Sequence, residues 1–244
     1  MDPVNLERIE IKPIELLKEA KEMLGDQYWL FVAMTFIALV IGGALPFGIL
    51  MGPMMCGLFL CLMEQRKKGV ADFGTLFKGF EYFAESLIAT LIMMAIVMVI
   101  VTPVILLFVA GMVMGGVMLG DDGGPVLMVV SMAIFYPLLF LVSFLAQLPF
   151  LFVYPLIVGH GLKAVPAITT SWAGVKLNFM PLAIMLFVFS VLSILAALMC
   201  ILPVYLLAPL TMGAMYLAYT RIFPRSLKEQ IAAGEAPAKP GAQM

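Results

Sequence analysis

The chain has 244 residues, of which 64% are hydrophobic and 12% charged, and its formal net charge is −1. Soluble domains carry roughly 25% charged and about 45–50% apolar residues, so a water-surrounded core cannot bury this much apolar surface. The composition therefore excludes an ordinary soluble domain. The absence of a basic patch interleaved with aromatic residues argues against nucleic acid as a partner.

The N-terminal quarter of the chain predicts one helix on the membrane surface and two membrane spans. We expect residues 1–12 to be flexible. Residues 13–24 form an interfacial helix with Ile14, Leu17, Ala20 and Leu24 on its apolar face. A span over residues 28–45 and a second one ending near Met63 follow, joined by a tight turn at Pro46-Phe47-Gly48.

A basic stretch and an amphipathic segment come next. Arg66, Lys67 and Lys68 precede residues 73–84, in which apolar residues recur at i, i+3, i+4 and i+7. This period predicts a helix with an apolar face that includes Phe73, Phe77 and Phe80. We therefore interpret these six residues as a candidate interface for membrane lipids or a partner protein.

The remaining chain predicts four more spans and a disordered tail. The third span covers residues 87–112, and the fourth lies within the apolar run 126–158. Residues 179–200 and 203–219 form the last two spans. Residues 224–244 are rich in Ala, Gly and Pro and predict disorder. The expected fold is thus an all-α membrane helix bundle of about six spans, with a membrane domain over residues 13–223.

The basic residues predict the orientation of the six spans. Every Lys and Arg of the chain lies in four segments that six crossings place on one side, namely 1–27, 64–85, 159–178 and 220–244. The opposite side holds Asp121 and Asp122 and no basic residue. By the positive-inside rule, both termini are cytoplasmic, and we expect a bacterial cytoplasmic (inner) membrane.

Weak similarities predict that one unit, an interfacial helix followed by a hairpin of two spans, occurs three times, over residues 13–65, 73–158 and 167–222. Residues 69–80 align without gaps with 164–175, so that Phe77 meets Trp172 and Gly79 meets Gly174. Gly52-Pro53 with Gly57 matches Ala208-Pro209 with Gly213, and Pro149 is the candidate equivalent in the middle copy. Coincidence of apolar composition is the alternative explanation.

These features carry a family resemblance. The order of interfacial helix and hairpin, the Gly-Pro or Ala-Pro in the second arm and the closing Tyr219-Thr220-Arg221 resemble a loose group of uncharacterised bacterial multi-pass membrane proteins. They are also similar to the membrane domain attached to some glycerophosphodiester phosphodiesterases. The 244 residues leave no room for the soluble phosphodiesterase domain, so the resemblance implies location and shape, and no catalytic residue is carried over.

Few residues offer chemistry. His160 is the single histidine, and we expect it to be a partly solvated loop residue. A metalloprotease of the His-Glu-x-x-His type needs two histidines and is therefore excluded. The three cysteines lack a metal-binding spacing, so no cofactor or metal is expected. Pro53, Pro149 and Pro209 are candidate helix breaks, which either expose carbonyl groups to a substrate or are packing kinks.

Two functions remain open from the sequence. The first is a non-enzymatic membrane protein that binds lipid, packs against other membrane proteins or itself, or acts as a scaffold. The alternative is a channel or facilitator for a small uncharged or lipidic substrate, built around the proline-containing helices. A continuous polar cavity at bilayer depth would favour the alternative.

Overall fold

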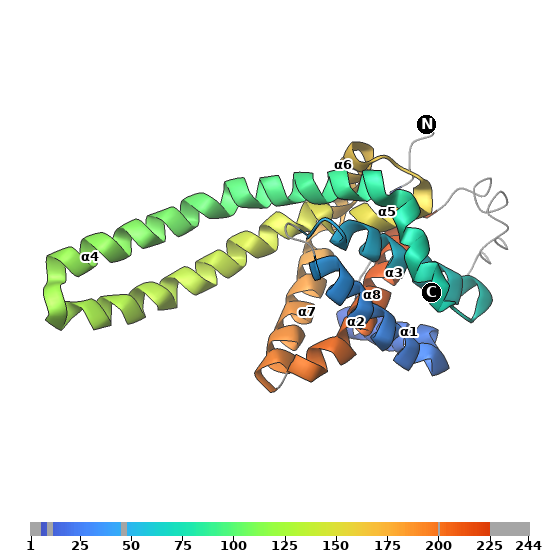
Figure 1. Cartoon of the computed structure of the whole chain (residues 1–244), viewed down its shortest axis with the longest axis horizontal. Helices are drawn as coiled ribbons and strands as arrows, with labels where there is room; N and C mark the ends of the chain where they lie inside the picture. Colours follow the sequence, from blue (N-terminus) through green and yellow to red (C-terminus); the bar gives the residue numbers. More distant parts are fainter. Residues whose placement is uncertain (1–5, 9–11, 45–47, 200, 225–244) are drawn as a thin grey trace. The chain divides into compact units, whose positions relative to one another are not determined.

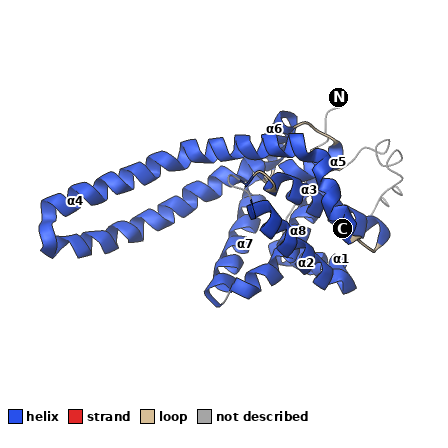
Figure 2. Cartoon of the chain, viewed as in Figure 1, coloured by secondary structure: helices blue, strands red, loops and turns tan. Residues whose placement is uncertain are grey.

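The computed structural model describes residues 6–8, 12–44, 48–199 and 201–224, with side chains described throughout except at 115–127 and 201. Every regular element within these ranges is helical (Figure 2), which confirms the all-α prediction. The elements are α1 (Pro13–Leu24), η1 (Gly25–Gln27), α2 (Tyr28–Ala44), α3 (Met51–Lys68), η3 (Phe73–Tyr82), α4 (Phe83–Gln147), η4 (Leu148–Phe150), α5 (Val153–His160), α6 (Ala164–Leu177), α7 (Phe179–Met199) and α8 (Ile201–Ile222), where η denotes a 3-10 helix.

Five helical stretches of the described residues are long and apolar enough to cross a membrane, which indicates a multi-pass membrane protein. They are Pro13–Ala44, Phe73–Met114, Met128–His160, Phe179–Met199 and Leu202–Ile222. Six spans were predicted, and the difference is α3, whose last five residues include Glu64 and three basic residues. Its apolar part, residues 51–63, is about 20 Å long at 1.5 Å per residue, shorter than the roughly 30 Å of a hydrocarbon core.

The chain divides into two units, residues 1–90 with 151–244, and residues 91–150. The second unit is most of α4, which turns back on itself as a helical hairpin (Figure 1). The rings of Phe108 and Phe135 stack between its arms, with their centroids 3.9 Å apart. Large apolar side chains such as Leu107 and Val99 are about three-quarters exposed (75% and 73%). A hairpin that exposes such large apolar side chains is suited to lipid rather than water.

In the first unit, the buried face of α1 differs from the predicted one. Leu16, Ala20 and Leu24 are buried, whereas Ile14 is 64% exposed. The register is set by α8, against which α1 packs, since a Cβ atom added to Gly213 would lie 3.0 Å from the Cβ of Ala20. The sequence pattern alone fitted both faces, because apolar residues occur on each.

The amphipathic segment after α3 is helical, but it is a 3-10 helix and not the predicted α-helix. Its three-residue period replaces the pattern of i, i+3, i+4 and i+7. Gly74 and Gly79 each lower α-helix propensity by about 1 kcal/mol, which weakens the α form over this short stretch. The aligned segment in the third copy, α6, is an α-helix.

Five prolines lie at the third position of a helix and do not interrupt it. Pro53 is the third residue of α3, and the same position of four other helices holds Pro155, Pro166, Pro181 and Pro203. The first turn needs no backbone N–H donor, so proline is tolerated there. Pro53 is therefore not a break within a span. Pro149 lies in η4, between α4 and α5, and Pro209 is inside α8.

The ends of the chain are described only in part. The predicted disordered tail lies outside the described residues except for Pro224. In the predicted flexible N-terminus, the backbone N–H of Glu7 donates to the carbonyl of Ile222 at 3.0 Å. The side-chain amide of Asn178 donates to the carbonyl of Glu7 at 2.9 Å. Residue Glu7 is thus tied to the ends of α6 and α8.

Candidate functional site

The 3-10 helix η3 has three distinct faces because its side chains repeat every three residues. Leu76 and Gly79 are buried on the first face, against α3. Phe77, Phe80 and Phe83 follow one another on the second face and are 42%, 38% and 37% exposed. The third face carries the exposed charged residues Lys78 and Glu81. We call Phe77, Phe80 and Phe83 the phenylalanine stripe.

Close backbone packing holds η3 on α3. A Cβ atom on Gly57 would collide with the carbonyl of Leu76, and one on Gly79 would collide with the carbonyl of Pro53. Only glycine permits two helices to approach so closely. The phenylalanine stripe is therefore presented from a fixed base.

The carboxylate of Glu64 holds the start of η3. It accepts hydrogen bonds from the hydroxyl of Thr75 at 2.7 Å and from the backbone N–H of Asp72 at 3.3 Å, and it forms an ion pair with Lys68 at 2.8 Å. The hydrogen bonds from Lys68 and Thr75 lower the pKa of Glu64 to about 2. Glu64 is thus ionised at neutral pH, where it can accept all three bonds.

The six residues of the predicted lipid or partner interface do not form one surface in the structure. Arg66 donates to the hydroxyl of Thr220 at 2.8 Å and lies 5.9 Å from the centroid of the Tyr216 ring. Lys68 binds Glu64, and Lys67 is exposed. The ring of Phe73 is half-buried, with its centroid 5.8 Å from that of Phe77. Phe77 and Phe80 remain as an exposed apolar pair, and the structure adds Phe83.

His160 is the last residue of α5, and its Nδ1 lies 2.7 Å from the hydroxyl oxygen of Tyr219. Sequence reasoning missed this pair because 59 positions separate the two residues. A side chain at Gly159 would collide with the same hydroxyl, so the glycine allows the close contact. The pair joins the ends of α5 and α8.

A hydroxyl group approaches the proline break in α8. Pro209 has no N–H, so the carbonyl of Tyr205 lacks its helical donor. The hydroxyl of Tyr28, on α2, donates to the neighbouring carbonyl of Leu206 at 2.6 Å. This hydrogen bond ties α2 to α8 beside Pro209, so the proline lies at a packed contact between two helices, which favours a packing kink.

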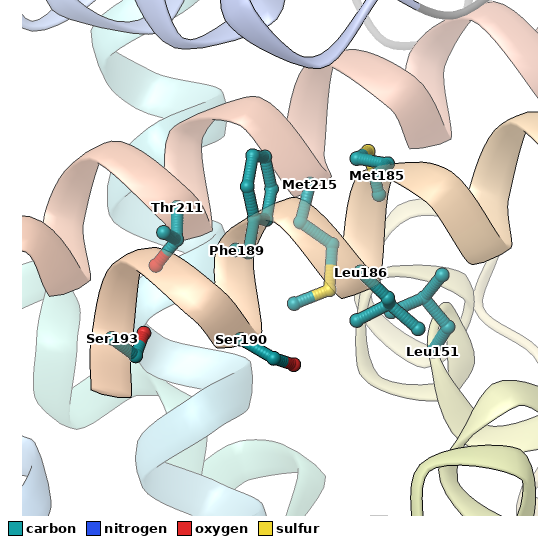
Figure 3. Close-up of a pocket in the computed structure, with 8 residues that line it drawn as sticks. All are labelled: Leu151, Met185, Leu186, Phe189, Ser190, Ser193, Thr211 and Met215. Carbon is teal, nitrogen blue, oxygen red and sulfur yellow. The ribbon is translucent and has the colours of Figure 1, made fainter. Parts of the chain in front are cut away.

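A pocket of about 220 Å³ lies among α7, α8 and the residue after η4 (Figure 3). Its wall is largely apolar, with three hydroxyl side chains, and the lining residues are Leu151, Met185, Leu186, Phe189, Ser190, Ser193, Thr211 and Met215. The sequence analysis did not single out Ser190 and Ser193 and did not predict a pocket. Their i, i+3 spacing on α7 was the available signal.

Cys56 and Cys61 are buried free thiols in α3, and Cys200 lies outside the described residues. No group of three or more His, Cys, Asp or Glu side chains gathers within the described ranges. Comparisons with protein-family models, curated proteins and solved structures return no match for this chain.

Proposed function

We propose that the chain is a non-enzymatic protein of the bacterial cytoplasmic membrane whose role is to hold an aromatic surface in the cytoplasmic lipid interface. In this proposal the chain crosses the bilayer six times, as three copies of an interfacial helix and a hairpin, with both termini cytoplasmic. The resemblance to bacterial multi-pass membrane domains remains a separate prediction.

Hydrogen bonds between successive copies support the threefold arrangement. A polar side chain at the start of each hairpin binds the backbone at or before the interfacial helix of the next copy, and the third copy returns to the first. The three pairs are Gln27 with Ala71 at 2.7 Å, Glu85 with Ala164 at 2.8 Å, and Asn178 with Glu7 at 2.9 Å. Such a closed cycle is expected of three related units and not of unrelated hairpins.

The second arms of the hairpins support it as well. Each contains a proline followed four residues later by glycine, as Pro53 with Gly57, Pro155 with Gly159, and Pro209 with Gly213. Pro155 therefore replaces Pro149 as the equivalent in the middle copy. Each of these arms packs against the interfacial helix of the next copy: α3 against η3, α5 against α6, and α8 against α1.

The phenylalanine stripe is the observation that carries the proposed function. Full burial of one Phe side chain contributes roughly 1.5–3 kcal/mol, so covering the exposed parts of three adds about 2–3 kcal/mol. Directly after the stripe in the sequence, Ile88 and Leu91 on α4 are 45% and 46% exposed, and they belong to the candidate span Phe73–Met114. Acyl chains that surround the span can cover the stripe in the same layer, while Lys78 and Glu81 stay among headgroups and water.

Tryptophan scanning in lipid vesicles tests this proposal. Trp29 and Trp172 are first replaced by Phe, and a single Trp is then introduced as Phe80→Trp or Lys78→Trp. The fluorescence of Phe80→Trp should be blue-shifted by its apolar surroundings and quenched by brominated acyl chains, whereas Lys78→Trp should stay largely unquenched. Equal quenching at both positions, in variants with the helical circular dichroism of the parent, would refute the placement of the stripe in lipid.

A further inference from the structure

The pocket between α7 and α8 lies at the middle of both helices. Ser190 is about 16 Å from the start of α7 at Phe179, and Thr211 is about 16 Å from the end of α8 at Ile222, at 1.5 Å per residue. Both α7 and most of α8 are among the candidate spans. The three hydroxyl groups therefore lie near the centre of the hydrocarbon layer, where water is scarce.

Two of these hydroxyl groups are available for a ligand. The hydroxyl of Thr211 donates to the carbonyl of Ala208 on its own helix at 2.9 Å, as helical threonines commonly do. Neither Ser190 nor Ser193 hydrogen-bonds to another residue of the described chain, and Figure 3 shows both on the pocket wall formed by α7. A hydroxyl group without a partner in an apolar medium costs roughly 1–3 kcal/mol, which a ligand's polar atom can recover.

The rest of the wall decides the class of ligand. Leu186, Phe189 and Met215 offer an apolar surface, and none of the eight lining residues is charged. A charged ligand would have no counter-ion here. A pure hydrocarbon would leave the serine hydroxyls unbonded. The volume of about 220 Å³ is smaller than the 300 Å³ or more of typical drug-sized sites.

We propose that this pocket binds a small neutral amphiphile with a short apolar body and one oxygen that hydrogen-bonds to Ser190 and Ser193. A medium-chain alcohol has this chemistry. The oxygen lies against α7, where it accepts from one serine and donates to the other, and the chain contacts Leu186 and Met215. The site belongs to the third copy and is independent of the phenylalanine stripe, so either proposal can fail without the other.

Photolabelling of the full chain in lipid nanodiscs tests the site. The probes are an eight-carbon alcohol that carries a diazirine and the matched eight-carbon hydrocarbon diazirine without the hydroxyl group. Mass spectrometry should find the alcohol on α7 and α8 around Leu186 and Met215, and excess 1-octanol should reduce this labelling at least five-fold. The hydrocarbon probe should label these residues no more than it labels lipid-exposed positions such as Leu195.

Variants supply the second arm of the test. The double change Ser190→Ala and Ser193→Ala keeps the pocket's shape and should reduce alcohol labelling at least five-fold. The matched change Ser131→Ala and Ser143→Ala, on α4, should leave it unaltered. Equal labelling by both probes in the unmodified chain would overturn the proposal, and so would equal effects of the two double changes. The comparison of the two probes uses the unmodified chain, so it remains valid even if a variant fails to fold.

Discussion

Gly57 and Gly79 set the distance between α3 and η3. A Cβ atom added to either glycine would collide with a backbone carbonyl of the other element. Backbone cannot rotate away as a flexible side chain can, so the two elements would have to separate. The same separation would move the phenylalanine stripe.

Gly57→Ala should therefore destabilise the protein by roughly 1–3 kcal/mol, the usual range for overpacking a close contact. The measurement is the free energy of unfolding in detergent micelles. Gly43→Ala in α2 is the matched control, because nothing lies within 4 Å of its added Cβ. The control should be neutral or stabilising by up to about 1 kcal/mol. Equal stability of the two variants would contradict the close approach.

The sequence indicated that these glycines matter but not what they contact. Gly79 was aligned with Gly174, and a Cβ on either residue would collide with a neighbour, the carbonyl of Pro53 for one and the ring of Phe223 for the other. Small residues in membrane helices predict close packing. They do not identify the partner, since any apolar helix can fill that place.

At the scale of elements, the break in α8 is coupled to α2. The hydroxyl of Tyr28 binds the carbonyl of Leu206, three residues before Pro209. The sequence left two interpretations of this proline, a substrate site or a kink. It could not choose between them because 178 positions separate the donor from the acceptor.

A double-mutant cycle tests this coupling. Tyr28→Phe should lower the free energy of unfolding by about 1 kcal/mol, the value of one hydrogen bond. In a Pro209→Ala background the loss should shrink, because the restored N–H of residue 209 can donate to the carbonyl of Tyr205 and straighten the turn that presents the neighbouring Leu206 carbonyl to Tyr28. Tyr205→Phe is the control, because the ring of Tyr205 packs edge-on against Phe36 and a Phe ring preserves this contact. Additive effects of Tyr28→Phe and Pro209→Ala would show that Tyr28 acts by packing alone.

For a related reason, the sequence alone could not predict that η3 is a 3-10 helix. Over ten residues, apolar side chains at Phe73, Leu76, Phe77 and Phe80 fit a period of 3.6 as well as one of 3.0. The difference decides which face meets α3. In the α-helical interpretation Leu76 and Phe77 share a face, whereas in the 3-10 helix Leu76 is buried and Phe77 is exposed.

At the scale of the whole molecule, the apolar runs predicted the helices well because lipid selects long uncharged segments. The long-range pairs were not predictable. Arg66 reaches Thr220 across 154 positions, although the sequence analysis placed it with Lys67 and Lys68 in a candidate interface for lipids or a partner protein. A basic residue at the end of a span can bind a headgroup, a helix terminus or another span, and its position in the sequence does not distinguish these.

Both the six-span topology and the threefold arrangement require that α3 crosses the membrane. Labelling of single cysteines by a membrane-impermeant maleimide in intact cells tests it most directly. In a chain with Cys56, Cys61 and Cys200 replaced by Ala, Ala44→Cys lies at the end of α2 and Lys67→Cys in the last turn of α3. The account predicts that Ala44→Cys is labelled in intact cells and Lys67→Cys only after the membrane is permeabilised. Labelling of both positions from the same side would contradict the six-span, threefold account.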